Sequence, residues 1–354
     1  KLSFQKPHTV VSSSKINGGC RSDLSAVINC QICEPHDHVV KENDLAGSDP
    51  AAFHDYICGT IPVNPSTTAL LFTAAAMHNA ALVLKNDGEL EVLAVCTAGV
   101  ENNAARAGDP APLRELEGQF TKAGTINLMI AVNQPLSQGA HIQAAVTAAE
   151  AKTAALQELL VSSRYSPGQA TGTGTDSIAL ASQLEGKKAL TDAGHHTKLG
   201  EIIALAVKQG IKESLALQNC LTPDTQRHAG KLLARFGPAG DTLIKQIGRN
   251  LEPGTLAVFE ANAAEVLTDP MVYGAVSALV HGYELLTYGV LPDACFRELA
   301  VSYAAQIAAA VSGNAGLFTR FLDELNTRVT ETPVHKTVIE LAAGAIALGF
   351  SARW

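Results

Sequence analysis

The stretch TAAEAKTAALQELLVSSRYSPGQATGTGTDSIALAS, residues 147–182, contains a helical pattern, a glycine-rich loop and a short apolar run, in that order. Apolar residues at helical spacing among good helix formers predict a helix over residues 138–160. Ser166-Pro167-Gly168 then forces a turn, because proline fixes φ and glycine permits either sign of it. The apolar run at residues 178–181 follows, so we expect a helix and a strand to flank the loop.

The loop at residues 170–176, ATGTGTD, alternates glycines with threonines and ends in a carboxylate. Alternating glycines let the backbone approach a ligand closely, so we interpret this segment as the candidate active-site loop. A tight turn capped by its threonines is the alternative. A dinucleotide-binding fingerprint is not expected, because it needs a strand before its glycines and a helix after them. The candidates for catalysis are Thr173, Thr175 and Asp176, and those for substrate binding are Thr171, Gly172 and Gly174.

Two other polar segments supply candidate site residues. A buried strand predicted at residues 90–97 runs into the loop at residues 97–108, and ligands of α/β sheets favour the carboxyl ends of strands. The segment at residues 192–201 opens a predicted helix, where a histidine near a glycine-rich loop suits a general base or a ligand. Capped helix starts are the alternative for both segments. The candidate binding residues are Asn102, Asn103, Arg106, Lys198 and Glu201, and the candidate bases are His195 and His196.

Glu150 and Lys152 lie in the predicted helix that precedes the loop. Residues two apart point to different faces of a helix, so these charges do not form a helical ion pair. We expect one of them to face solvent.

The group Cys30-x2-Cys33-x2-His36-x-His38 has the ligand types of a zinc site. Its spacing is compressed, no second ligand cluster lies nearby, and on a strand Cys30 and Cys33 would point to opposite faces. We therefore expect buried or loop thiols, and we predict no metal and no cofactor. His78, in an apolar segment, is interpreted as a core histidine.

The composition limits the classes of function. The chain has 354 residues, a formal charge of −8 and 47% hydrophobic residues. It has no basic run, so a nucleic-acid partner is not expected, and no uncharged apolar segment reaches about 18 residues, so neither is a membrane span. Seven scattered cysteines, an odd number, indicate reduced thiols and a cytoplasmic location.

The remaining patterns predict an α/β or α+β fold, with a mixed sheet flanked by helices and an all-helical C-terminal region. We expect two domains, residues 1–222 and 223–354, and the sequence leaves open whether the second supports homo-oligomerisation. Strands are expected at residues 9–14, 26–32, 90–97 and 124–132, an irregular excursion at 41–66, and either a strand and a helix or one buried helix at 67–84. Helices are expected near residues 227–235, 240–250, 254–267, 270–288, 293–312, 315–328 and 334–350.

Seven motifs occur in one order along the chain: SSSKINGG at 12–19, AVIN at 26–29, LLFTAA at 70–75, TAGVENNAARAGD at 97–109, GTINLMI at 124–130, AAEAKTAALQELLVSSRYSPGQATGTGTDSIAL at 148–180 and HHTKLGEIIALAV at 195–207. Together they resemble the adenosylcobinamide amidohydrolase family of corrinoid salvage. The ATGTGTD loop with its preceding EAKTAAL helix is the most specific part. The helical region beyond about residue 224 and the Cys30 group depart from the family pattern.

The resemblance implies hydrolysis of the amide that joins aminopropanol to a propionate side chain of the corrin ring, giving adenosylcobyric acid and 1-amino-2-propanol. An uncharged amide needs an activated nucleophile, a stabilised oxyanion and a proton for the leaving amine. On this interpretation the loop threonines supply the nucleophile and the N–H of Gly172 or Gly174 supplies the oxyanion site. His195 or His196 acts as the base, and Asp176 orients that base or activates water.

The partner that the resemblance implies is a corrinoid small molecule, whose amide fringe forms hydrogen bonds. The expected contacts are Asn17, Asn102, Asn103 and Arg106. A water bound to a metal held by histidine and aspartate is the competing mechanism. Two other classes of function stay open: a corrinoid-binding protein without catalysis, and a nucleotide-binding enzyme, which the missing P-loop lysine disfavours.

Overall fold

The computed structural model describes residues 1–32, 48–111, 125–186, 188–237, 241–328 and 334–353. The chain divides into two compact units, Lys1–Thr222 and Pro223–Trp354. The predicted class, a mixed α/β fold with helices at the C-terminus, is confirmed. Three members of the cysteine and histidine group with zinc-ligand types, Cys33, His36 and His38, lie outside the described residues.

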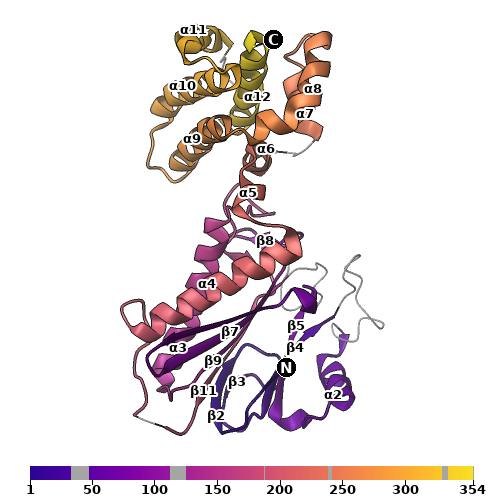
Figure 1. Ribbon diagram of the computed structural model, residues 1–354, viewed down its shortest axis with the longest axis vertical. Helices are drawn as coiled ribbons and strands as arrows, with labels where there is room; N and C mark the ends of the chain where they lie inside the picture. Colours follow the sequence, from indigo (N-terminus) through magenta and orange to yellow (C-terminus); the bar gives the residue numbers. More distant parts are fainter. Residues whose placement is uncertain (33–47, 112–124, 187, 238–240, 329–333, 354) are drawn as a thin grey trace. The chain divides into compact units, whose positions relative to one another are not determined.

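A six-stranded mixed sheet forms the centre of the first unit (Figure 1). Its strands are β2 (His8–Ser12), β3 (Gly19–Arg21), β6 (Ala81–Asp87), β7 (Leu90–Ala98), β9 (Ile126–Val132) and β11 (Ser177–Gln183), in the order β3-β2-β11-β9-β7-β6. β9 and β11 are parallel, and every other pairing in this sheet is antiparallel. The carboxyl end of β7 therefore lies beside the amino ends of β9 and β11.

A smaller sheet packs on one face of the larger one. It consists of β1 (Leu2–Ser3), β4 (Ala26–Gln31) and β5 (Thr68–Thr73), with β4 and β5 parallel. Side chains of both sheets form one buried cluster, which includes Val10, Val27, Leu71, Met129 and Ala179. The other face of the small sheet is covered by α2 (Pro50–Thr60), whose Phe53 packs on Ile28 and Leu70.

Two long helices, α3 (Gln138–Glu158) and α4 (Lys198–Asn219), cover the opposite face of the six-stranded sheet (Figure 1). α3 presents alanines to this face, so its backbone can approach the sheet and α4 closely. These alanines are fully or almost fully buried: Ala140, Ala144, Ala148, Ala151 and Ala155. The first unit thus has four layers, namely the helix pair, the large sheet, the small sheet and α2.

Three expectations about the first unit were wrong. Part of the excursion expected at residues 41–66 is the helix α2, which Asp49 caps by accepting a hydrogen bond from the Ala52 N–H at 3.0 Å. The segment at residues 67–84 holds two strands, β5 and β6, joined through the short helix η2 (Met77–Asn79), and no long helix. His78 lies in that connection and is exposed, so it is not a core histidine.

The second unit is helical throughout its described residues. Its helices are α5 (Pro223–Gln226), α6 (Ala229–Leu233), η4 (Ala234–Phe236), α7 (Asp241–Gly248), α8 (Pro253–Thr268), α9 (Pro270–Thr287), α10 (Asp293–Ser312), η5 (Ala315–Leu317), α11 (Phe318–Arg328) and α12 (Val334–Arg353). Phe259 of α8 meets Phe350 of α12 edge to face, with ring centroids 5.2 Å apart. The predicted C-terminal helices are therefore present.

No described helix is by itself long and apolar enough to cross a bilayer. α8 and α9 meet the length and hydropathy criterion only as a pair, and they are bent by 74° at the break between them.

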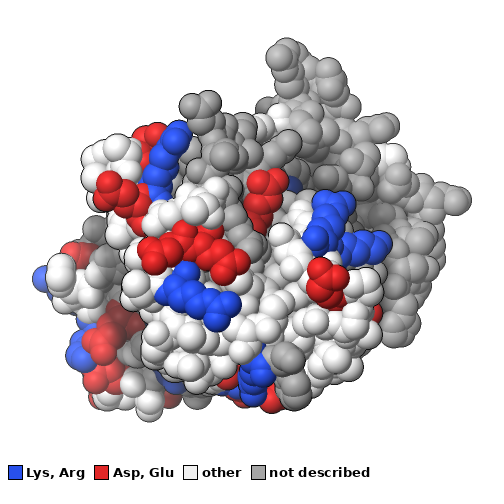
Figure 2. Space-filling model, turned by 90° about the horizontal axis from the view of Figure 1, so that it is seen from above, with Lys and Arg blue, Asp and Glu red and all other residues white. Residues whose placement is uncertain are grey.

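On the face of the molecule in Figure 2, acidic and basic side chains are interspersed among uncharged ones, and the described residues show no broad basic patch there.

Candidate active site

The candidate loop at residues 170–176 meets the loop that follows β7. A two-stranded ladder joins them, made of β8 (Ala104–Ala105) and β10 (Gly172–Thr173). The Thr171 N–H donates to the Ala105 carbonyl at 2.9 Å, and the Ala107 N–H donates to the Thr171 hydroxyl at 2.8 Å. Two of the three segments predicted to form the site are therefore neighbours.

The carboxylate of Asp176 lies just before β11 and accepts four hydrogen bonds. Oδ1 accepts from the Thr173 hydroxyl at 2.6 Å and from the Ile126 N–H at 3.1 Å. Oδ2 accepts from the Thr173 N–H at 3.1 Å and from the Lys152 ammonium. An ionised carboxylate offers about four lone-pair positions, so the fold engages all of them and fixes the orientation of this group.

Lys152 on α3 was not among the predicted site residues. Its side chain is 15% exposed and its ion-pair partner Asp176 is 17% exposed. The spacing of Glu150 and Lys152 is the sequence pattern that could have identified Lys152. The two side chains lie on different faces of α3, as expected for residues two apart. Glu150 is the member that faces solvent, with a side chain 53% exposed.

Gly172 makes room for the Lys152–Asp176 pair. A Cβ at this position would lie 2.4 Å from Asp176 Oδ2 and 2.8 Å from Lys152 Nζ. Gly174 is different, because a Cβ there would meet nothing within 4 Å. Gly174 is exposed, and within the described part of the chain its N–H donates no hydrogen bond, so this backbone donor beside Thr173 is not engaged.

Thr175 is tied to the amino end of β9. The Thr125 hydroxyl donates to the Thr175 carbonyl at 2.6 Å, and the two hydroxyl oxygens lie 2.5 Å apart. Thr125 is 3% exposed. These bonds hold the loop against the sheet next to the point where Asp176 reaches the Ile126 N–H.

Asp109 holds the loop after β7 against the turn that precedes the candidate loop. Its Oδ2 accepts from the Ser163 hydroxyl at 2.5 Å and from the Arg106 N–H at 2.8 Å. Burial raises the pKa of Asp109, but hydrogen bonds from Ser163, Ser166 and the Arg106 N–H outweigh it and leave that pKa below its usual value. Arg106 itself lies over Gly168, where a Cβ would come 2.6 Å from Arg106 Cδ.

The two asparagines of this loop have different environments. Asn102 is exposed, whereas Asn103 is 2% exposed. The residues of the predicted site that the structure brings together are Asn102, Asn103, Arg106, Thr171, Gly172, Thr173, Gly174, Thr175 and Asp176.

A buried polar network fixes the strand ends beneath the loops. The Asn29 amide donates to the Thr97 hydroxyl at 2.9 Å, and the Asn127 amide donates to Asn29 Oδ1 and to the Phe72 carbonyl, each at 2.8 Å. Asn127 and Thr97 have no exposed surface. Because Asn127 follows Ile126, this network also holds the N–H that binds Asp176.

The predicted histidines precede α4, and no described contact joins them to Asp176. β11 carries the chain away from Asp176 over seven residues, about 23 Å at 3.3 Å per residue. α4 then returns, and its Ser214 hydroxyl accepts from the Ala98 N–H at 2.9 Å at the carboxyl end of β7. The first turn of α4 lies about 24 Å from Ser214 along the helix axis.

The side chains at that first turn have exposed partners. His195 Nε2 lies 2.6 Å from Glu150 Oε2, with side chains 61% and 53% exposed. Lys198 pairs with Glu201 at 2.8 Å, also on the surface. His196 is exposed as well. The structure therefore does not bring His195, His196, Lys198 or Glu201 together with Asp176.

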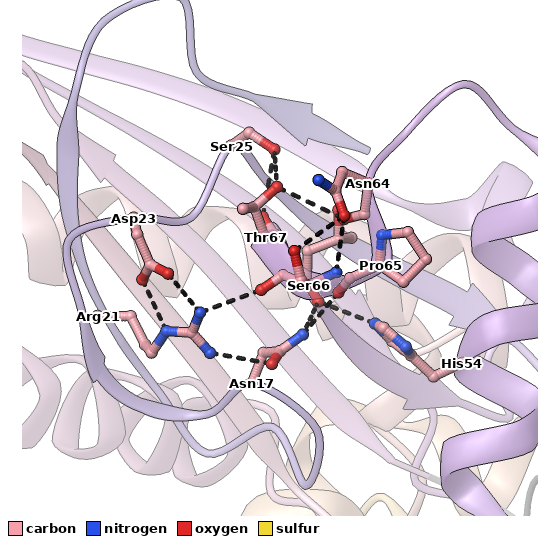
Figure 3. Close-up of polar contacts among 10 residues, drawn as sticks. Asn17, Arg21, Asp23, Ser25, His54, Asn64, Pro65, Ser66 and Thr67 are labelled. Carbon is pink, nitrogen blue, oxygen red and sulfur yellow. Dashed lines mark hydrogen bonds and ion pairs between the residues drawn. The ribbon is translucent and has the colours of Figure 1, made fainter.

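Asn17 belongs to a separate cluster at the amino end of β5 (Figure 3). Its amide donates to the carbonyls of Pro65 and Thr68, each at 2.8 Å, and its Oδ1 accepts from Arg21 at 2.9 Å. Its φ of 56° is left-handed, a conformation that asparagine tolerates. These bonds join the turn after β2 to the start of β5, and the structure does not bring Asn17 to the Asp176 loop.

Three comparisons relate this chain to known proteins. A family model described as adenosylcobinamide amidohydrolase matches residues 1–223. An uncharacterized protein of Methanocaldococcus jannaschii is 36% identical over 180 residues, which are 47% of this chain and 70% of that protein. The crystal structure of a Pyrococcus horikoshii protein is similar at 14% identity and a TM-score of 0.31, covering 61% of this chain and 74% of that one. The family model spans the whole of the first unit, and the chain therefore belongs to the adenosylcobinamide amidohydrolase family.

Proposed function

We propose that this protein hydrolyses the aminopropanol amide of adenosylcobinamide to adenosylcobyric acid and 1-amino-2-propanol. Family membership supports the reaction class and a corrinoid substrate. The observation that carries the proposal is the Thr173 hydroxyl held 2.6 Å from a carboxylate that also binds a lysine ammonium. A hydroxyl, a base and a cation held together in this way can catalyse amide hydrolysis.

The roles follow from the surroundings of each group. Asp176 is the base, because it already accepts the Thr173 hydroxyl hydrogen. Lys152 forms an ion pair with this carboxylate and holds it in position. The N–H of the exposed Gly174 stabilises the developing oxyanion.

The corrin ring would lie on the neighbouring loop. Asn102, Arg106 and Thr171 present amide, guanidinium and hydroxyl groups beside the β8–β10 ladder and suit the amide fringe of the substrate. The candidate binding residues Asn17, Lys198 and Glu201 are not included, because each is occupied in a contact elsewhere. The cytoplasmic location stays a prediction from the cysteine content.

Incubating the purified full chain with adenosylcobinamide tests the proposal. We expect equimolar release of 1-amino-2-propanol and adenosylcobyric acid, each identified by mass. Tight binding of the corrinoid with no release would instead support a non-catalytic corrinoid-binding protein. Turnover of ATP with no effect on the corrinoid would support the nucleotide-binding alternative.

A further inference from the structure

We propose that Thr173 is the nucleophile and carries the corrinoid acyl group as an ester between two half-reactions. The inference rests on the proposed amide hydrolysis and goes beyond it, because it chooses between attack by a side chain and attack by water. It starts from three hydroxyls in one loop, whose surroundings differ.

Among the described residues, the Thr173 hydroxyl is the one of the three loop hydroxyls that lies on a carboxylate. The Thr171 hydroxyl accepts the Ala107 N–H at 2.8 Å and thereby joins two loops. The Thr175 hydroxyl lies 2.5 Å from that of Thr125, a neutral group that is itself buried. The Thr173 hydroxyl donates to Asp176 Oδ1 at 2.6 Å and is partly exposed. A carboxylate can accept a proton from this hydroxyl as the oxygen attacks.

The saturation of Asp176 argues against water as the first nucleophile. Its four acceptor positions hold the Ile126 N–H, the Thr173 N–H, the Thr173 hydroxyl and the Lys152 ammonium. A water molecule would have to displace one of these donors before Asp176 could take its proton. Attack by Thr173 needs no such displacement, because the hydrogen bond already lies along the proton's path.

The first half-reaction balances with these groups alone. Thr173 Oγ1 forms a bond to the amide carbonyl carbon while its proton passes to Asp176. The carbon–nitrogen bond then breaks, and the departing nitrogen takes up that proton, so 1-amino-2-propanol leaves and a threonyl ester remains. The Gly174 N–H is the donor for the carbonyl oxygen as its charge develops.

The second half-reaction restores the enzyme. In the ester Thr173 Oγ1 no longer donates a hydrogen bond, so one acceptor position of Asp176 becomes available to a water molecule that enters after the amine has left. Water adds to the ester carbonyl and gives one proton to Asp176, the carbon–Oγ1 bond breaks, and Oγ1 recovers the proton from Asp176. The product is the free corrinoid acid, and no oxidant, reductant or further reactant is consumed.

A partition experiment tests for the ester. The full chain is given adenosylcobinamide and two analogues whose amines are ethanolamine and propylamine, each at a fixed concentration of hydroxylamine. A shared ester intermediate gives the same ratio of hydroxamate to acid for all three amides, because the amine has left before the ratio is decided. Acid-quenched protein should also gain the mass of the corrinoid acyl group on the peptide that contains Thr173.

Substitutions connect the ester to Thr173. We expect Thr173→Ser to keep turnover within about tenfold and to carry the adduct on serine, and Thr173→Ala to lose about 10³-fold or more while still binding the corrinoid. Thr60→Ala, at the exposed end of α2, is the matched control and should match the wild type.

The outcomes separate the two levels of the proposal. A hydroxamate ratio that changes with the amine, or Thr173→Ala turnover above about a tenth of wild type with a normal melting temperature, would mean direct attack by water and would overturn the ester. Failure of the wild-type protein to release the amine from any of the three amides would overturn the proposed function itself.

Discussion

Two residues of α3 that are only two positions apart, Glu150 and Lys152, each form an ion pair, and the two pairs differ in burial and in their surroundings. The Lys152–Asp176 pair is 15% and 17% exposed and lies among backbone and hydroxyl donors. The Glu150–His195 pair is 53% and 61% exposed. An exposed pair is worth about 0–1 kcal/mol, because water and salt screen it and two flexible side chains must be ordered. The partly buried pair has a fixed geometry, and this is what a catalytic group requires.

Removing the charge of Asp176 should have the largest effect. Asp176→Asn takes away the acceptor for the Thr173 hydroxyl hydrogen and leaves Lys152 without its carboxylate. We expect kcat/KM for amide hydrolysis to fall by about 10²–10⁴-fold, with corrinoid binding largely retained.

The matched control for this change is Glu150→Gln, which removes the carboxylate of the exposed pair on the same helix. Its kcat/KM should stay within about twofold of wild type. Near-normal turnover in Asp176→Asn, or equal losses in both variants, would remove Asp176 from the mechanism.

Gly172 tests whether the close approach of the buried pair matters. Gly172→Ala would place a methyl group 2.4 Å from Asp176 Oδ2, so the carboxylate or the loop must shift. Overpacking of this kind costs about 1–3 kcal/mol of unfolding free energy, and it should also lower kcat, since the base moves away from Thr173.

Gly139→Ala is the control for Gly172→Ala, because a Cβ there would come no closer than 4.0 Å to any neighbour. Urea midpoints and kcat of both variants should be measured together. If Gly172→Ala matched Gly139→Ala in both quantities, the pair would tolerate movement and its geometry would not be critical.

The sequence predicts which loops carry the site, but it does not predict which helix residues lie beside Asp176. Glycines and hydroxyls at residues 170–176 and a strand end at residue 97 are local patterns, and both mark loops that the structure joins. The spacing of Glu150 and Lys152 on a helix likewise predicts that they diverge. Whether the next helix starts near the loop depends on the direction of β11, which is a property of the whole sheet.

The histidines illustrate why proximity along the chain misleads. His195 follows Asp176 by only 19 positions. The first seven of these residues form β11, which carries the chain across the sheet. Lys152 precedes Asp176 by 24 positions and still forms an ion pair with it. Tertiary packing, which no local pattern encodes, decides which of the two shares the site.

His141 extends the comparison to a buried histidine on the same helix. It is 1% exposed, with Nδ1 3.0 Å from the Ser137 carbonyl and Nε2 2.9 Å from the Ser182 hydroxyl. Burial lowers the pKa of His141, although hydrogen bonds with backbone carbonyls oppose this effect. The unfolded chain therefore binds a proton below a pH of about 6.5 that the folded chain does not.

It follows that His141 lowers the unfolding free energy as the pH falls below about 6.5, down to its folded pKa, and has no such effect above about 7. Urea unfolding at pH 7.5 and 5.5 should show a smaller acid-induced loss in His141→Gln than in wild type. An equal loss in the two proteins would mean that His141 titrates alike in the folded and unfolded states.

Substitutions of the exposed His195 and His196 should have the smallest effect on kcat/KM. His195→Ala and His196→Ala change exposed side chains that precede α4 and have no described contact with Asp176. Surface substitutions usually alter free energies by less than about 0.5 kcal/mol, so kcat/KM should stay within about twofold for each variant and for the double variant. The pH profile of kcat/KM should also keep its shape, because neither imidazole exchanges a proton with the substrate. A loss of about 100-fold in either variant, with an unchanged melting temperature, would return a histidine to the role of base and would require the first turn of α4 to reach Asp176 when the corrinoid binds.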